Sequence, residues 1–329
     1  MKRKITTCND CQPLDRRGFV KTVGAAAIAG TASTTLFDSR FAHAAPTANS
    51  AAESAVARFY ASLSETQKKL ICRPFNDNLR NRINANWHVT KPLIGDGTFN
   101  DDQQALINEI VRNVTSPDGY ERLVRQMDDD DGGISAYSCA VFGDPESGKF
   151  EFELTGRHLT LRADGNSVDK AAFGGPIVYG HGEEEAKENL FHYQTKQANE
   201  VFKALDADQA KLALLNKPPR ETAVQIQEAG SKLPGISVSQ LSEDQKELVE
   251  QTLKVLLAPY RKEDTDEVFA ILKASGGLEK LHMAFYKEGD LNDDNIWDNW
   301  RIEGPSLVWH FRGAPHVHAY INIAGATKS

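Results

Sequence analysis

Two histidines stand two residues apart near the end of the chain, at His316 and His318. Residues two apart in a β-strand face the same side, so both imidazoles would point to one place. His310 lies on the preceding predicted strand and His158 on a predicted strand in mid-chain, and pairing of these strands would bring four imidazoles together. Because imidazole suits zinc, copper, iron and nickel, the pattern predicts a mononuclear transition-metal site, with zinc or copper expected first.

Other side chains could act beside such a metal. His181 lies between glycines that let the backbone bend sharply or approach a ligand, and we expect it on a loop ahead of a helix. Arg157 and Arg312 could hold an anionic substrate group or stabilise developing charge. These three residues are the predicted catalytic residues. Glu183–Glu185 are expected only to complement a helix dipole.

The plainer interpretation of the histidines is that they are half-buried sheet residues, hydrogen-bonded to carboxylates. Asp128–Asp131, followed by two glycines, is expected to be a solvated turn rather than a calcium site. Cys72 and Cys139 could pair in an oxidising compartment, but buried free thiols are the favoured interpretation. The formal net charge of −8, without a basic stripe, argues against nucleic-acid binding.

The N-terminal segment resembles a twin-arginine export signal. Arg16 and Arg17 precede a weakly apolar run, Val23–Thr35, which is too short to span a membrane. Ala42-His43-Ala44 then fits a small-x-small cleavage site. We therefore expect the twin-arginine machinery as a partner, no transmembrane span, and a periplasmic or extracellular location. The expected division is a signal peptide at 1–44, a flexible mature N-terminus at 45–54, a folded domain at 55–324 and a tail at 325–329.

A short motif recurs along the chain: an apolar residue, a capping residue, and a glutamine three places after the cap. It is centred on Ser64, Asp206 and Ser242, with a looser case at Asn100. Each instance fits a capping box and predicts a helix start. Local capping is favoured over an internal repeat as the reason for the recurrence.

Apolar spacing predicts mainly helical segments at residues 53–127 and 184–285. Alternating polarity predicts strands between and after them, at residues 150–155, 157–162, 167–172, 306–312 and 317–323. This order predicts one large α+β domain, in which helices pack on a mostly antiparallel sheet built from central and C-terminal strands.

Four stretches carry a resemblance to a known family: Gly156–Leu161, Phe173–Pro176, Trp300–Ser306 and His316–His318. They look like the family catalogued as domain of unknown function 3500, DUF3500. The similarity covers nearly the whole predicted mature chain, from about residue 55 to residue 323.

The family pattern has a Gly-His-His strand, a Pro/Gly loop, and a late Gly-Pro strand followed by His-x-His. The resemblance matches His158 to the second histidine of the first element, and His316 and His318 to the last element. Arg157 stands where many members have histidine, and His310 lies close to where many have an acidic residue. The family name states no activity, so the resemblance strengthens the histidine site and leaves the reaction open.

These features together predict an exported metal-dependent protein that acts on a small molecule. As an enzyme it would be a hydrolase or an oxidoreductase. The alternatives are a non-catalytic periplasmic protein that binds a metal or a small ligand, which a closed four-ligand site would favour, and a purely structural exported domain.

Overall fold

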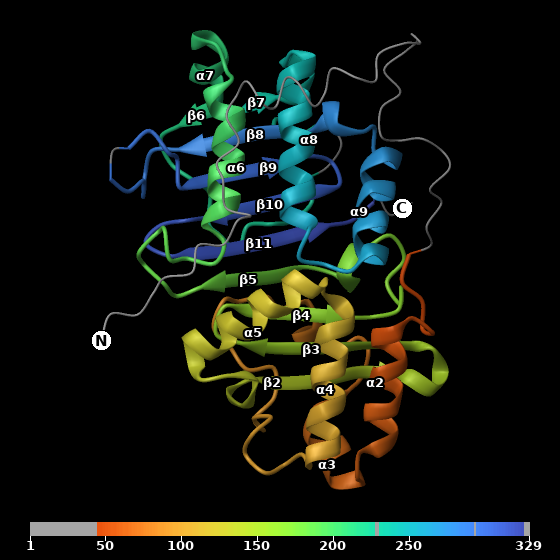
Figure 1. Cartoon of the computed structure of the whole chain (residues 1–329). Helices are drawn as coiled ribbons and strands as arrows, with labels where there is room; N and C mark the ends of the chain where they lie inside the picture. The colour runs from red at the N-terminus through yellow and green to blue at the C-terminus, as the bar shows by residue number, and fades with distance from the viewer. Residues whose placement is uncertain (1–44, 228–229, 293, 326–329) are drawn as a thin grey trace, which may run out of the picture. The chain divides into compact units, whose positions relative to one another are not determined.

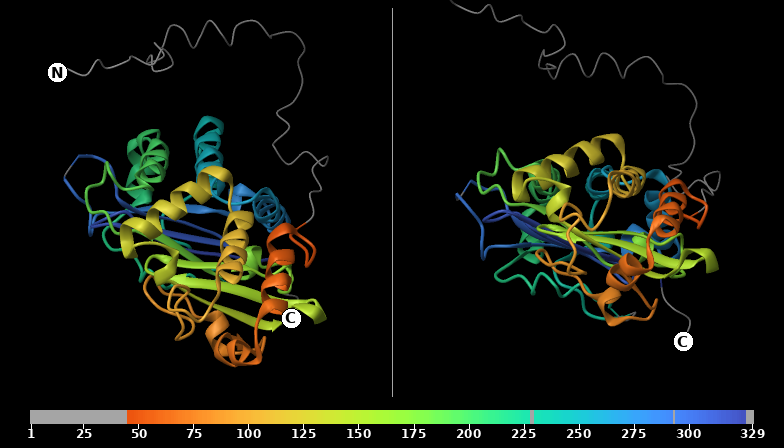
Figure 2. Two further views of the ribbon diagram at one scale, coloured as in Figure 1. Left: turned by 60° about the horizontal axis from the view of Figure 1, so that its bottom comes forward. Right: turned by 90° about the horizontal axis from the view of Figure 1, so that it is seen from below.

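The strands form one sheet, and the helices lie across its front in Figure 1. The computed structural model describes residues 45–227, 230–292 and 294–325. Figure 2 shows helices on one face of the sheet and irregular covering segments on the other. On that second face, Ala85 and Val224 from the covering segments pack on sheet residues Val178, Val308 and Tyr320. The predicted α+β class, with a mostly antiparallel sheet, is confirmed.

The helices and strands are short and alternate in blocks along the chain. The helices are α2 (Ala51–Ser62), α3 (Glu65–Ile71), α4 (Asp101–Val114), α5 (Pro117–Asp131), α6 (His192–Lys203), α7 (Ala207–Ala213), α8 (Glu243–Leu257) and α9 (Lys262–Ala274). The strands are β1 (Cys72–Arg73), β2 (Ser138–Asp144), β3 (Lys149–Gly156), β4 (Leu159–Ala163), β5 (Ile177–His181), β6 (Leu214–Leu215), β7 (Ile236–Ser237), β8 (His282–Tyr286), β9 (Asn299–Glu303), β10 (Leu307–Arg312) and β11 (Val317–Ile323).

The sheet has two halves with the same sequence of elements. Its strand order is β1-β2-β3-β4-β5-β11-β10-β9-β8-β6, with β7 paired to β8 off this path. In each half two helices, a short strand, two more helices and four antiparallel strands follow one another, and the second half has the additional short strand β7 after β6. The halves join where β5 pairs antiparallel with β11. The order reads the same from either edge, which is the arrangement expected of a duplicated unit (Figure 1).

The recurring capping motif is part of this duplication. Ser64, Asn100, Asp206 and Ser242 all make the predicted capping boxes. In the first half Gln67 Nε2 donates to Gln103 Oε1 at 2.8 Å, 36 residues away. In the second half Gln245 donates to Gln209 at 2.8 Å, also 36 residues away. The helix starts are therefore confirmed, and the internal repeat, the less favoured interpretation, explains why they recur.

Several predicted elements differ from the structure. Residues 167–172 form turns rather than a strand, because Lys170 adopts a positive φ and the Asp164 carboxylate caps the backbone N–H of Asn166 and Val168. The segment 184–285 is less helical than expected, since residues 216–227 and 230–235 contain prolines and run irregularly over the sheet. Helix α2 begins at Ala51, so it includes part of the stretch expected to be flexible.

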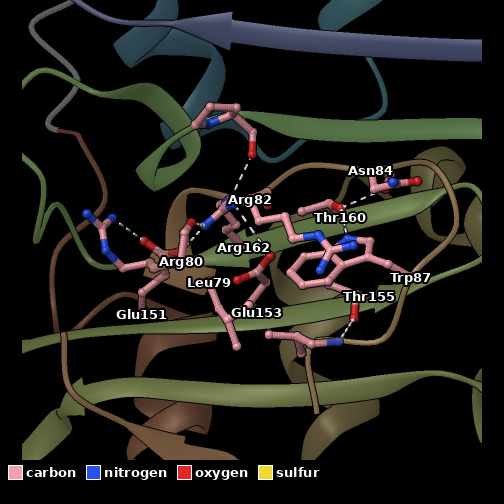
Figure 3. Close-up of polar contacts among 12 residues, drawn as sticks. Leu79, Arg80, Arg82, Asn84, Trp87, Glu151, Glu153, Thr155, Thr160 and Arg162 are labelled. Atoms are coloured by element: carbon pink, nitrogen blue, oxygen red, sulfur yellow. Dashed lines mark hydrogen bonds and ion pairs between the residues drawn. The ribbon is translucent and has the colours of Figure 1, made fainter. Parts of the chain in front are cut away.

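A buried ion-pair cluster fixes the covering segment of the first half to the sheet (Figure 3). Arg162 of β4 donates through Nη1 to Glu151 of β3, and its Nη2 lies 3.4 Å from Glu153 Oε1. Arg80, from the covering segment, reaches Glu151 at 3.1 Å. Every side-chain nitrogen of Arg162 has an acceptor, since Nε donates to the carbonyl of Pro176 and both Nη atoms reach further carbonyls. Removing one partner of such a cluster typically costs ~3–5 kcal/mol.

Three further expectations concern the export signal, a transmembrane span and the two cysteines. The predicted export signal, residues 1–44, lies outside the described residues. Within the described ranges, no helix has both the length and the hydropathy needed to cross a bilayer. Cys72 is half-buried, Cys139 is buried, and both are free thiols.

Candidate metal centre

Three histidines converge at one end of the central strands. Their candidate ligand nitrogens, from His158, His316 and His318, all lie within 4.8 Å of one another. The Nε2 atoms of His316 and His318 are 3.0 Å apart. The ring centroid of His158 lies 5.0 Å from that of His316 and 4.8 Å from that of His318. The structure thus brings together three of the four predicted metal ligands.

His158 comes from the tight turn between β3 and β4, not from within a strand as predicted. Gly156 pairs with Leu159, so Arg157 and His158 alone form the turn. His158 has φ +56°, a left-handed conformation that costs an ordinary residue ~1–2 kcal/mol. The Tyr137 hydroxyl donates to the carbonyl of Arg157 at 2.7 Å and holds the turn in place. A strained residue fixed by its surroundings is a common feature of functional sites.

His318 is the second residue of β11 and His316 immediately precedes this strand, and their side chains converge as their spacing predicted. His318 pairs across the sheet with Gly180 of β5 on one side and Arg312 of β10 on the other. A Cβ at Gly180 would lie 2.2 Å from the carbonyl of Val317 and 3.3 Å from Cβ of His158. The glycine therefore leaves the space into which the His158 side chain fits.

The carboxylate of Asp130 supports His158 from the helix side of the sheet. Its Oδ2 lies 2.7 Å from His158 Nδ1 and also accepts from Gln126 Nε2 at 2.7 Å. Its Oδ1 accepts from the backbone N–H of Gly182 at 2.8 Å. Burial opposes ionisation of Asp130, but the hydrogen bonds from His158 and Gln126 outweigh it, so its pKa lies below the usual range. Asp130 is therefore a carboxylate at neutral pH.

Asp130 belongs to a segment that was predicted to be a solvated turn. Residues 128–131 instead form the last turn of α5, which ends at Gly132 in a left-handed C-cap. This extension carries Asp130 over the end of the sheet, where its side chain is only 3% exposed.

The carboxylate of Glu221 supports His318 from the opposite face. Its Oε2 lies 2.9 Å from His318 Nδ1, and its Oε1 lies 3.1 Å from Arg312 Nη1. Burial opposes ionisation of Glu221, but the hydrogen bond from His318 and the charge of Arg312 lower its pKa overall. Glu221 lies in the irregular segment after α7. Like Asp130, it contacts a histidine of the triad and was not among the predicted site residues.

These contacts leave ring nitrogens free to bind a cation. His158 and His318 each present Nδ1 to a carboxylate, so Nδ1 carries the proton and Nε2 keeps its lone pair. Burial, together with neighbouring His318 and Arg312, lowers the pKa of His316 to about 4. Burial also lowers the pKa of His318, although Glu221 opposes the effect. His316 and His318 are therefore neutral at pH 7, which is the state that binds metal.

His310, the fourth predicted ligand, is not part of this triad. It lies on β10, paired with Arg301 and Tyr320, and is 1% exposed. Burial and the charge of Arg301 lower its pKa to about 4. Its Nδ1 has no hydrogen-bond partner among the described residues. It lines a hollow of about 510 Å³ together with Glu221 and Arg312, which we name the Glu221 hollow.

His181 and Arg157 lie beside a second hollow, of about 460 Å³, which also includes Asp130 and which we name the Asp130 hollow. His181 is the last residue of β5, rather than part of a loop before a helix as predicted. Its Nδ1 accepts from the backbone N–H of Leu190 at 3.2 Å, and its Nε2 lies 3.3 Å from Asp129. Its position suits a proton donor or acceptor at this hollow. The acidic run after it does not open a helix, because α6 starts at His192 with no acidic residue in its first turn.

Comparisons with known proteins place the chain in a family without adding a function. No curated protein and no solved structure matches it. One family model matches residues 45–322, which cover the triad, both supporting carboxylates and both hollows, and its description is protein of unknown function (DUF3500). The chain therefore belongs to the DUF3500 family.

Proposed function

We propose that this protein is an exported metalloenzyme that binds one transition-metal ion through His158, His316 and His318. Zinc is the preferred ion, and the reaction class is hydrolysis of a small molecule. The observation that carries the proposal is the convergence of three imidazoles, two of which are oriented by carboxylates.

The distances are compatible with a single ion. Two nitrogens bound tetrahedrally at the usual zinc distance of about 2.0–2.1 Å are separated by roughly 3.3 Å. The 3.0 Å between His316 Nε2 and His318 Nε2 is close to this value. Without a cation or a proton between them, two lone pairs this close would repel each other. A carboxylate on Nδ1 also raises the basicity of each supported imidazole.

The ligand count favours catalysis over storage. Structural zinc sites have four protein ligands, whereas catalytic sites have three and an open position. Among the residues that the structure describes, the cluster contains three candidate ligands. Zinc held in this way lowers the pKa of a bound water to about 7 and supplies a nucleophile at neutral pH. His181, in the Asp130 hollow, is the nearby proton-transfer group that we assign to the reaction.

Elemental analysis of the purified exported protein tests the site. We expect about one metal ion per chain, lost in His318→Ala and kept in His282→Ala and His192→Ala. These controls remove imidazoles from β8 and α6, outside the triad. A chain without metal, or His318→Ala with full occupancy, would contradict the proposal. Copper in place of zinc would retain the site and shift the reaction class to oxidation.

Hydrolysis of 4-nitrophenyl acetate, a general probe for zinc-activated water, tests the reaction. The zinc-loaded protein should hydrolyse it with a rate that rises through a pKa near 7. His318→Ala and the chelator-treated protein should show only the background rate. A stable zinc complex with no activity above that of His318→Ala would instead support a binding protein.

Export is tested separately. Replacing Arg16 and Arg17 by lysine should keep the precursor inside the cell, because the twin-arginine machinery reads that pair as an address. Normal export of this variant would reject the predicted signal.

A further inference from the structure

Arg312 has an unpaired edge beside the triad. Its Nη1 binds Glu221, which in turn binds His318. Its Nε and Nη2 are buried and have no acceptor in the described part of the chain. These two nitrogens form one edge of the guanidinium, which matches the two oxygens of a carboxylate. Leaving charged donors buried and unpaired is costly, so the edge calls for an anionic partner.

The chain contains an example of this edge in use. Arg261 donates through Nε and Nη2 to the two oxygens of Asp264, at 2.9 and 3.2 Å. The same guanidinium donates through Nη1 and Nη2 to Glu53, at 2.8 Å each. A single arginine in this fold can therefore hold two carboxylates. Arg312 holds one carboxylate among the described residues, that of Glu221.

Comparison of the two halves of the sheet shows that the second half lacks an acidic residue at a position where the first half has one. On β4, Arg162 pairs with Glu153 of β3, and its nitrogens are saturated by carboxylates and carbonyls (Figure 3). At the equivalent place in the second half, His310 of β10 pairs with Arg301 of β9. Arg301, whose Nε pairs with Glu303, thus occupies the position that Glu153 has in the first half. Nη1 of Arg301 and Nδ1 of His310 are both buried without partners among the described residues.

Two of the residues with unpaired nitrogens, Arg312 and His310, line a hollow large enough for a small molecule. Arg312 and the buried His310 both line the Glu221 hollow, whose volume is about 510 Å³. Ligand sites commonly have volumes of ~300–1,000 Å³ and contain a few convergent polar groups. Lys217 and Arg220 add positive charge to its lining, and Glu221 and Glu288 add negative charge.

We infer that the Glu221 hollow is a substrate subsite that takes a carboxylate group on the Nε and Nη2 edge of Arg312, with His310 as a second donor. The inference rests on the proposed function, because it makes the substrate of the metal site a small carboxylic acid. The carboxylate would be held next to the triad through Glu221, which contacts both Arg312 and His318.

Calorimetric titration of the mature protein with succinate and succinamide tests the subsite. These probes have similar shapes and differ in charge. We expect succinate to bind and succinamide not to bind, both in metal-free protein and in zinc-loaded protein. The metal-free titration excludes simple coordination to zinc, and the comparison of ligands on the unaltered chain needs no variant.

Arg312→Lys keeps the charge and removes the two-nitrogen edge, so it should weaken succinate binding at least tenfold. Lys211→Gln is the matched control, because it removes a charge from α7, outside the Glu221 hollow, at a side chain that is 74% exposed. It should change binding less than twofold.

The outcomes separate this inference from the proposed function. Equal binding of the two ligands, succinate binding only in the presence of zinc, or unchanged binding by Arg312→Lys would overturn the subsite. Tighter binding of inorganic phosphate with the same dependence on Arg312 would overturn the assignment to a carboxylate. Succinate binding that depends on Arg312 in a chain that never binds metal would reject the metalloenzyme and leave the anion site standing.

Discussion

Asp130→Asn should weaken zinc binding by roughly 10- to 100-fold, although Asp130 is not itself a ligand. In the native protein, one oxygen of Asp130 accepts from His158 Nδ1 at 2.7 Å and the other from Gly182 N at 2.8 Å. Asparagine has only one side-chain oxygen for these two donors. If that oxygen stays with Gly182, the amide NH₂ faces His158 and favours the tautomer with a proton on Nε2. That tautomer cannot bind the ion.

The opposite amide orientation carries a similar penalty. The oxygen then serves His158, but the buried N–H of Gly182 meets an NH₂ group and loses its acceptor. An unpaired buried donor costs ~1–3 kcal/mol. Zinc binding would force this second orientation, and a 10- to 100-fold loss of affinity corresponds to ~1.4–2.7 kcal/mol, which matches the cost of that switch.

Asp129→Asn provides a matched control. Asp129 precedes Asp130 on α5, is half exposed, and lies 3.3 Å from His181 rather than beside His158. Competition for zinc against a chromophoric chelator at pH 7.5 measures the affinities, and thermal unfolding of the metal-free proteins shows whether folding is affected. We expect a change of less than twofold for Asp129→Asn. Equal affinities of Asp130→Asn and the native protein, or equal losses in both variants, would refute the argument.

Two further predictions concern stability and packing. Burial raises the pKa of Glu153 to about 8, with Arg162 only partly opposing it, so folding favours its protonated form. The stabilisation that protonated Glu153 gives to the folded state is complete below its unfolded pKa near 4.5 and is lost as the pH rises through about 8. The free energy of urea unfolding should therefore fall over this pH interval in the native protein, and it should fall less in Glu153→Gln. Gly182→Ala should destabilise the fold by ~1–3 kcal/mol and lower zinc affinity at least tenfold, because its Cβ would lie 2.6 Å from Asp130 Oδ1 and 3.3 Å from His158 Cε1. Urea unfolding and the same chelator competition would check this, and unchanged values would contradict the packing argument.

Features that depend on local chemistry could be predicted from the sequence. The four capping boxes follow from side chains three residues apart, and the structure contains all of them. The convergence of His316 and His318 follows from strand alternation, which acts over two residues. Both β10 and β11 lie within about a residue of the predicted strands.

Features that depend on distant partners could not be predicted in this way. The alternating polarity of residues 150–162 continues through the turn, so it does not show where β3 ends. The left-handed position in this turn is His158, and no glycine there indicates the turn. Asp130 contacts a histidine 28 residues away, and Glu221 contacts one 97 residues away. Neither carboxylate has a local signal that separates it from solvated acidic residues. Which charged residues face each other across a sheet can be predicted only when the order of the strands is known.

The duplicated fold explains why the candidate metal centre is single. The turn after β3 is Gly156-Arg157-His158-Leu159, and the equivalent turn after β9 is Gly304-Pro305-Ser306-Leu307. Ser306 therefore stands where the first half has His158, a candidate ligand. The other two candidate ligands belong to the second half, at the beginning of β11 and just before it, where this strand pairs with β5. Because neither half contains all three imidazoles, a bound ion would join the halves across the β5–β11 seam and stabilise their association as well as supply chemistry.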